Sequence, residues 1–311
     1  MPTTRQSIIR GPGTVSFGGV KLFDADGIEA SVESSTQEVP SSISGRLDTI
    51  KTDQTGRVSL TPVGNLSADI LAVLFPSWMR TPEIGRSVFG SADAPLAISS
   101  KAGTKVTFAA AALTKCPELR LSPVKTAFGP CEFTALLPNG KLPDDQSSKL
   151  YAVAQAAYAD GDAPRNGLTG FHYTGTFGQL SIPDTRDGWT VAVALRLEPV
   201  ATDSQGTIDY TLQGVDVTAK CTPLGLTEAQ ILAALPALKG RGASLAGTDD
   251  LVIASSGGLK ATLRCATVVT GPLQWGATRL RAGEIGFTAH ADGDGKLFDV
   301  SMAAAQAASG S

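Results

Sequence analysis

The sequence predicts a mainly β protein of two tandem domains, each a small β-sandwich or half-barrel with one short flanking α-helix. Three observations predict it. Apolar and polar residues alternate in several segments, one helical segment recurs in both halves of the chain, and 34 glycines and 18 prolines are spread over 311 residues. A hydrophobic content of 42% and a charged content of 18% are ordinary for a folded globular protein.

The strands are predicted from alternation. Residues 190–198, 207–213 and 259–265 each place apolar side chains at every second position, as Val191, Val193 and Leu195 do in the first of these segments. A period of two with one apolar face is typical of antiparallel strands that bury one side on a core.

An internal repeat predicts the domain organisation. Residues 61–74 and 222–235 share eight of fourteen residues without a gap, 161 positions apart. Weaker matches follow in the same order in both halves: Thr14–Gly18 with Thr174–Gly178, Gly45 and Asp48 with Gly206 and Asp209, Leu96–Ile98 with Leu251–Ile253, Lys105–Phe108 with Lys260–Leu263, Phe133–Ala135 with Phe287–Ala289, and Lys141 with Lys296. The predicted division is a first domain over residues 1–143, a linker over 144–167 and a second domain over 168–311.

Three helices are expected. Residues 67–75 and 227–235 each carry one apolar stripe, with Ser67 and Thr227 as N-caps. Thr227 and Gln230 have the spacing of a capping box, and a proline follows each segment. The third expected helix covers residues 146–159 of the linker, where apolar residues recur at helical spacing. The residues that follow position 302 are small and polar, and are expected to be loosely held.

Composition and charge exclude several classes of protein. A net charge of −3 and a pI near 5.5 disfavour tight nucleic-acid binding. The apolar runs at 70–75 and 106–113 are too short to span a bilayer, and residues 1–7 have no apolar core of a signal peptide, so no membrane partner is expected. The four cysteines lie far apart and are predicted to be small buried residues in a reducing compartment: Cys116, Cys131, Cys221 and Cys265.

The sequence has no signature of an enzyme or of a cofactor site, so we expect no catalytic residue, no bound cofactor and no metal site. The only two histidines, His172 and His290, do not align in the repeat, and no G-x-S-x-G segment is present. Gly11-x-Gly13 lacks the third glycine of a dinucleotide fingerprint. The segment Asp292–Gly295 lacks the other ligands of a calcium loop and is predicted to be a hairpin turn.

Three stretches carry a resemblance to a known family: Ile9–Gly19, the polar Ser41–Gly56 with the following Val58–Gly64, and Lys220–Gln230. In overall pattern, over nearly the whole chain, the sequence resembles the tail-tube (major tail) proteins of long-tailed bacteriophages, or siphophages. The resemblance implies a structural virion protein made in the host cytoplasm, whose stacked rings form the conduit for DNA ejection. For two fused domains it implies homotrimer rings of pseudo-sixfold symmetry, in preference to hexamers. The implied partners are the tape measure, distal tail and terminator proteins.

Two groups of residues are candidates for function within such a tube. In the polar segment 39–56, the first group is expected to reach the neighbouring ring: Ser41, Ser44, Arg46, Asp48, Lys51 and Asp53. A plain mobile hairpin is the alternative, and the counterpart segment 200–206 looks shorter and simpler. The second group is a polar strand face that is expected to line the lumen: Thr207, Asp209, Thr211 and Gln213. An acidic or neutral lining would let DNA pass without binding, because a basic lining would bind many phosphates. An ordinary solvated strand face is the alternative.

Two other functions remain open at this stage. The protein could be another virion ring component on the same domain, such as a distal tail, hub or terminator protein, which forms one ring where a tube protein polymerises. A secreted sugar-binding or hydrolytic β protein is disfavoured by the missing signal peptide and by the low aromatic content of 6%.

Overall fold

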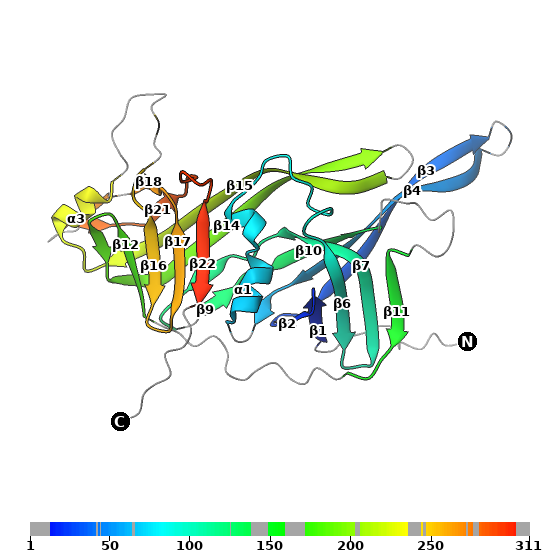
Figure 1. Ribbon diagram of the computed structural model, residues 1–311, viewed down its shortest axis with the longest axis horizontal. Helices are drawn as coiled ribbons and strands as arrows, with labels where there is room; N and C mark the ends of the chain where they lie inside the picture. The colour runs from blue at the N-terminus through cyan, green and yellow to red at the C-terminus, as the bar shows by residue number, and fades with distance from the viewer. Residues whose placement is uncertain are drawn as a thin grey trace.

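The computed structural model describes residues 13–41, 43, 45–63, 66–124, 126–137, 149–158, 172–202, 206–235, 244, 247–271, 273–275 and 280–302. Strands take up most of the described elements and all the paired strands are antiparallel, which confirms the predicted mainly β fold (Figure 1). We call residues 13–155 the first half and residues 173–302 the second half. Within the described residues, no helix has the length and apolar character needed to cross a membrane.

The first half forms one curved sheet and two short helices, and its strands β8 and β9 join a sheet of the second half. Its strands follow the order β3-β4-β10-β7-β6-β1-β2-β5, with β11 also paired to β7. The elements are β1 (Gly13–Phe17), β2 (Val20–Asp24), β3 (Glu29–Ser41), β4 (Gly45–Leu60), β5 (Pro62–Val63), α1 (Ala68–Leu74), α2 (Ser77–Arg80), β6 (Ala94–Ser100), β7 (Thr104–Lys115), β8 (Leu119–Leu121), β9 (Thr126–Phe128), β10 (Cys131–Leu136) and β11 (Tyr151–Gln155).

The second half has two main sheets and a separate hairpin. One sheet has the order β13-β12-β16-β17-β22, the other the order β18-β21-β15-β14-β8-β9, and β19 pairs with β20 alone. The elements are β12 (Tyr173–Phe177), β13 (Leu180–Ile182), β14 (Asp184–Thr202), β15 (Gly206–Leu224), α3 (Glu228–Ala233), β16 (Leu251–Ser255), β17 (Leu259–Leu263), β18 (Thr267–Thr270), β19 (Leu273–Trp275), β20 (Leu280–Ala282), β21 (Ile285–Thr288) and β22 (Phe298–Met302).

The same strand pairings occur in both halves, in the same order and register. Phe133 of β10 lies opposite Val58 of β4, and Phe287 of β21 lies opposite Ala219 of β15. The whole series of equivalent pairs is β1–β2 with β12–β13, β1–β6 with β12–β16, β6–β7 with β16–β17, β11–β7 with β22–β17, β3–β4 with β14–β15, β10–β7 with β21–β18, and β8–β9 with β19–β20. Residues that hold the same place in this series are called counterparts below.

One strand explains why the sheets are counted differently in the two halves. In the first half β7 is continuous, and it pairs with β6 and β11 along one part and with β10 along another. In the second half the equivalent strand is interrupted between β17 and β18, where Cys265 has a φ of 41°. A left-handed residue other than glycine bends the chain out of the ladder, so one sheet becomes two.

The predicted linker helix over 146–159 is wrong for its described residues. Residues 151–155 form β11, which pairs with β7 as β22 pairs with β17. Tyr151 and Phe298 are therefore counterparts. Lys141, which the repeat matched with Lys296, lies outside the described residues. The prediction was wrong because apolar residues at helical spacing indicate only a local preference, and here backbone pairing with β7 determines the structure.

The other two helices and their caps are confirmed. Ser67 accepts a hydrogen bond from the backbone of Ile70 at the start of α1. Thr227 and Gln230 form both hydrogen bonds of the capping box at the start of α3. The first helix ends at Leu74, with Phe75 as its C-cap directly before Pro76, because a residue that precedes proline resists helical geometry.

The buried side chains of both halves form one contiguous hydrophobic cluster. Cys116, Cys131 and Cys221 lie within it as free thiols, which confirms the prediction of small buried cysteines at these positions. Burial raises the pKa of the Cys131 and Cys221 thiols to about 12 and raises that of Cys116 further still. These thiols stay protonated and unreactive at neutral pH, because the thiolate is the nucleophilic form.

Candidate assembly surface

The two halves are joined by a strand of one that extends a sheet of the other. Strand β8 of the first half pairs antiparallel with β14, so that Leu119, Arg120 and Leu121 lie opposite Val191, Thr190 and Trp189. Strand β9 then completes the edge of this sheet. The hairpin β8–β9 thus leaves its own half and covers the outer edge of β14.

Gly188 allows this close approach. Its φ is +87°, and a Cβ at this position would lie only 2.7 Å from Cα of Ser122 and would also collide with the carbonyl oxygen of Leu121. Only glycine fits both the backbone conformation and the space.

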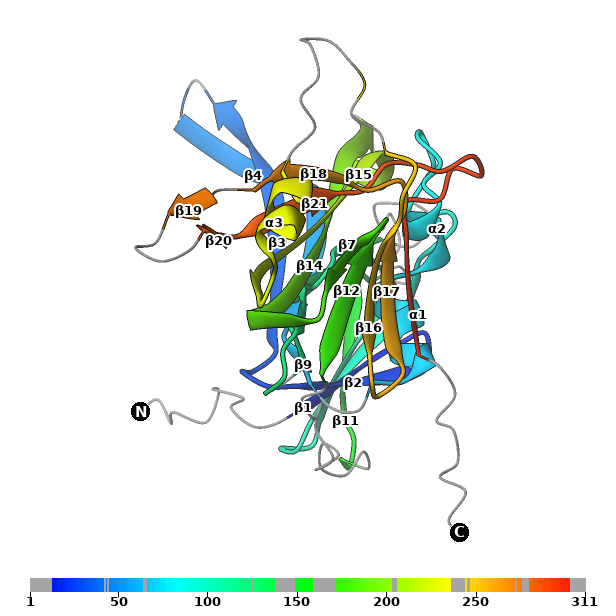
Figure 2. The same cartoon turned by 90° about the vertical axis from the view of Figure 1, so that its left-hand side faces the viewer.

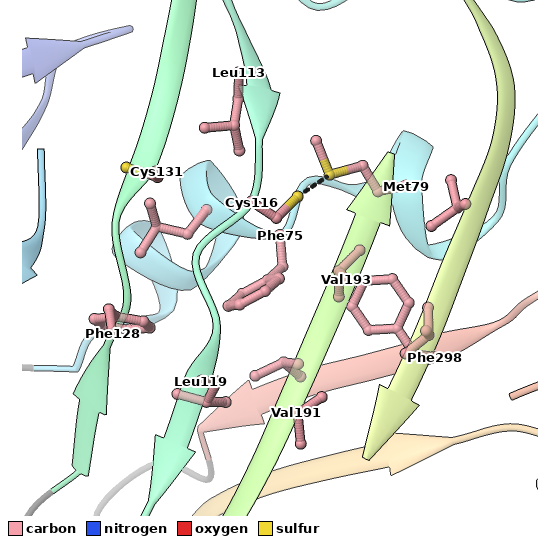
Figure 3. Packing of buried hydrophobic residues seen from close by; sticks show 14 of the residues in the cluster. Phe75, Met79, Leu113, Cys116, Leu119, Phe128, Cys131, Val191, Val193 and Phe298 are labelled. Carbon is pink, nitrogen blue, oxygen red and sulfur yellow. Dashed lines mark hydrogen bonds between the residues drawn. The ribbon is translucent and has the colours of Figure 1, made fainter. Parts of the chain in front are cut away.

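An apolar layer forms the second part of the contact. Phe75, at the end of α1, packs edge-on against Phe298 of β22 with 6.2 Å between ring centroids. Figure 3 shows Met79, Cys116 and Leu119 of the first half in one packed group with Val191, Val193 and Phe298 of the second. The thiol of Cys116 donates to the sulfur of Met79 over 3.2 Å. Burial of this layer holds the halves together by the hydrophobic effect.

Polar groups add specific links across the same contact. The guanidinium of Arg80 binds Asp299 at 2.9 Å, and the backbone N–H of Leu297 donates to the carbonyl oxygen of Arg80. The hydroxyls of Thr126 and Tyr173 share a hydrogen bond. Burial raises the pKa of Tyr173, so its hydroxyl remains neutral and available for this bond.

Two groups of predicted site residues meet at a third contact. The hydroxyl of Thr207 donates to Asp53 over 2.8 Å, which places the tip of the β14–β15 hairpin against β4. The carboxylate of Asp209 accepts from the backbone N–H of Phe89 at 2.9 Å. Backbone bonds also join Val88 to Tyr210 and Leu212 to Arg86, so a first-half segment runs along β15. Sequence reasoning treated these residues as separate groups, whereas the structure joins Asp53 to Thr207.

The remaining predicted residues make local contacts. Ser41 accepts from the backbone of Ile43, and Asp48 accepts from that of Thr49. The hydroxyl of Thr211 donates to the carbonyl oxygen of Glu198, and the exposed Gln213 donates to the carboxylate of Glu198 over 2.7 Å. Arg46 and Lys51 are located as backbone within β4, and Ser44 lies outside the described residues. Roles in ring contact and in lining a lumen stay predictions for all of them.

The polar segment 39–56 belongs to a long hairpin, in which β3 pairs with β4. The expectation that its counterpart is shorter is wrong, because β14 and β15 are 19 residues each. The two hairpins point the same way in Figure 1, but the β14–β15 tip lies over the first half and the β3–β4 tip extends past the body of the chain.

Three of the elements that join the halves, β14, β22 and α1, have exposed counterparts elsewhere on the chain. Val193 and Val300, on β14 and β22, are 5% and 2% exposed, whereas their counterparts Val32 and Val153 are 38% and 60% exposed. Leu71 of α1 is 1% exposed and its counterpart Leu232 of α3 is 51% exposed. The first half therefore presents uncovered strands, and the second half presents an uncovered helix.

The edge of β3 is open where that of β14 is covered. Gly27 is the counterpart of Gly188, with a φ of +111°, and no atom lies within 4 Å of the Cβ position that would collide at Gly188. Both glycines follow an aspartate, and the shared Asp-Gly pair was the sequence signal that could have located this contact.

The described residues contain no cluster of three or more histidine, cysteine, aspartate or glutamate side chains of the kind that holds a metal ion. Asp292 is used as a turn residue: its carboxylate accepts from the backbone N–H groups of Asp294 and Lys296. The predicted turn at 292–295 is confirmed, with a backbone bond from Gly295 to Asp292. It is not the turn of a hairpin, because the strands before and after it, β21 and β22, belong to different sheets.

The Asp299→Asn substitution is expected to lower the free energy of unfolding by about 1–2 kcal/mol at neutral pH. Burial raises the pKa of Asp299, but the hydrogen bond and charge of Lys296 and the charge of Arg80 outweigh it, so the net pKa is lowered. A lowered folded-state pKa stabilises above the unfolded pKa of about 4, and this stabilisation is lost as the pH falls through the folded value. Urea unfolding at pH 7 and in acid measures it; the exposed Asp294→Asn is the control. A loss that persists unchanged in acid would contradict the assignment.

No protein-family model matches the chain, and no curated protein matches its sequence significantly.

Proposed function

We propose that this protein is a structural subunit that assembles with copies of itself into rings, and that stacked rings form the tail tube of a long-tailed bacteriophage. The observation that carries the proposal is the contact between the halves. It joins two equivalent sets of strands through unlike surfaces, with donor elements on one side and acceptor elements on the other. Such a head-to-tail contact generates a closed ring if its rotation closes, and a filament if it does not.

The duplication of the fold within the chain supports a ring of copies. Two fused modules of one fold supply two equivalent positions per chain, so three chains supply the six positions that the resemblance implies. Ring closure would also remove the open β3 edge, which is otherwise a site of uncontrolled strand pairing.

The proposed channel passes DNA without binding it. The solvent face of β14 and β15 pairs its charges: Arg196 with Asp216 at 3.1 Å, and Lys220 with Glu284 at 3.6 Å. Positive charges that are neutralised in this way offer few sites to phosphate, which suits a conduit for DNA. The net charge of −3 agrees with this role.

Negative-stain electron microscopy of the purified protein tests the proposal. We expect rings with a central hole that stack into tubes as the concentration rises. Single rings that never stack would favour the second candidate, a distal tail, hub or terminator protein. Particles without a hole at every concentration would refute both candidates.

The tip of the β3–β4 hairpin is expected to take part in ring formation. The equivalent β14–β15 tip contacts the neighbouring half through Thr207 and Asp53, which favours a contact within a ring over the contact between rings that the sequence suggested. Replacement of residues 37–50 by an Asn-Gly turn shortens the hairpin, retains Asp53 and keeps the strand register. We expect a folded variant that fails to form rings. Single rings that no longer stack would instead support a contact between rings.

A further inference from the structure

The contact between the halves uses elements that are present twice in the chain but occupied only once. The first half donates the hairpin β8–β9 and the helix α1, and the second half accepts them on β14 and β22. The equivalent donors of the second half are β19–β20 and α3, and the equivalent acceptors of the first half are β3 and β11. Among the described strands, β19 and β20 pair only with each other, and β3 is the outer strand of its sheet.

We infer that the second half of one copy binds the first half of another by repeating this contact, with β19 added antiparallel to the edge of β3 and α3 placed over β11. This inference rests on the proposed self-assembly and specifies its interface. The partner is a second copy of this chain, because the surface that would accept β19–β20 and α3 is that of a first half, formed by β3 and β11.

The repeated registers specify which residues meet. Glu29 of β3 lies opposite Ser59, as Thr190 of β14 lies opposite Lys220. Phe128 of β9 pairs with Leu119, as Ala282 of β20 pairs with Leu273. Since Arg120 lies opposite Thr190, Gln274 of one copy lies opposite Glu29 of the next. The flanking pairs are Leu273 with Ala30 and Trp275 with Ile28.

Open space and exposed apolar residues support this partner. At Gly188 the backbone of Leu121 and Ser122 lies next to the position that a Cβ would take. At Gly27 no atom lies within 4 Å of that position. On the acceptor side Val32 and Val153 are exposed, and on the donor side Leu232 is exposed, whereas their counterparts are buried. A second copy bound in this way would cover these positions.

The donor and acceptor surfaces of one chain cannot meet each other. Helix α3, against which β20 lies, is at one end of the long axis in Figure 1, and β3 extends to the other end. Figure 2 shows the hairpin β19–β20 projecting beside α3. The contact therefore links separate chains, and its repetition produces a ring or a linear polymer.

Disulfide trapping tests the register. The double variant Glu29→Cys with Gln274→Cys is oxidised in solution and examined on a non-reducing gel. We expect covalent dimers and larger species, because paired strands bring Cα atoms within the span of a disulfide. In the matched control Glu33→Cys replaces Glu29→Cys; Glu33 is exposed on the same face of β3 but lies four residues away. The variant Arg120→Cys with Thr190→Cys shows that this register position accepts a disulfide, and there the bond forms within one chain.

The outcomes separate this inference from the proposed function. Cross-linked chains from the Glu29 variant but not from the Glu33 variant support the interface, whether or not microscopy shows tubes. If the Arg120 variant forms its bond and the wild type forms rings, but neither intermolecular pair cross-links, the inference is overturned while the tube function stands. Cross-linking of both pairs to the same extent would also overturn it, because it would show collision rather than a register.

Discussion

The Gly188→Ala substitution is expected to destabilise the subunit by about 2–5 kcal/mol, whereas Gly27→Ala costs about 1–2 kcal/mol and stops assembly. The two glycines are counterparts with positive φ, so alanine strains the backbone at both positions. Their surroundings differ: a Cβ at residue 188 collides with the backbone of β8 within the chain, and a Cβ at residue 27 meets open space.

The two measurements separate stability from assembly. Urea unfolding at a concentration where the protein is monomeric gives the stability of each variant, and sedimentation velocity at high concentration gives its assembly. Gly27→Ala should fold and remain monomeric, because its Cβ occupies the space that we assign to β19 of the next copy. Equal stability losses in the two variants, or normal assembly of Gly27→Ala, would show that the β3 edge is not a second β14 edge.

Val153→Arg is expected to abolish assembly while the subunit stays folded. Val153 is 60% exposed on β11, so an arginine at this position remains solvated in the single chain. Val153 is the counterpart of Val300, which is 2% exposed. In the assembly the arginine would therefore be buried at the contact between copies. Burial of an unpaired charge at such a contact costs several kcal/mol, enough to dissociate the subunits.

The matched control is Val124→Arg, at a valine that is 87% exposed in the turn between β8 and β9. It should assemble like the wild type, and both variants should unfold at the wild-type urea concentration. Sedimentation velocity measures the mass of each. Full-size assemblies from Val153→Arg would rule out β11 as a covered surface.

Local patterns predicted most of the fold correctly. The alternation of apolar residues located parts of β14, β15 and β17, and the caps at Ser67 and Thr227 located α1 and α3. These features depend on neighbours in the sequence: a strand face on period two, and a cap on hydrogen bonds within four residues. Strand β11 was missed because its apolar spacing also fits a helix, and only its pairing with β7 excludes that.

The sequence by itself determined that the chain is mainly β and that one segment occurs twice, because periodicity and identity are local properties. The tertiary structure alone decided which copies of each element are covered. Val193 and Val32 have the same side chain, but only the first lies in the apolar layer that residues of the two halves share. Burial at such a contact depends on backbone pairing between distant segments, and residue spacing along the chain does not encode it.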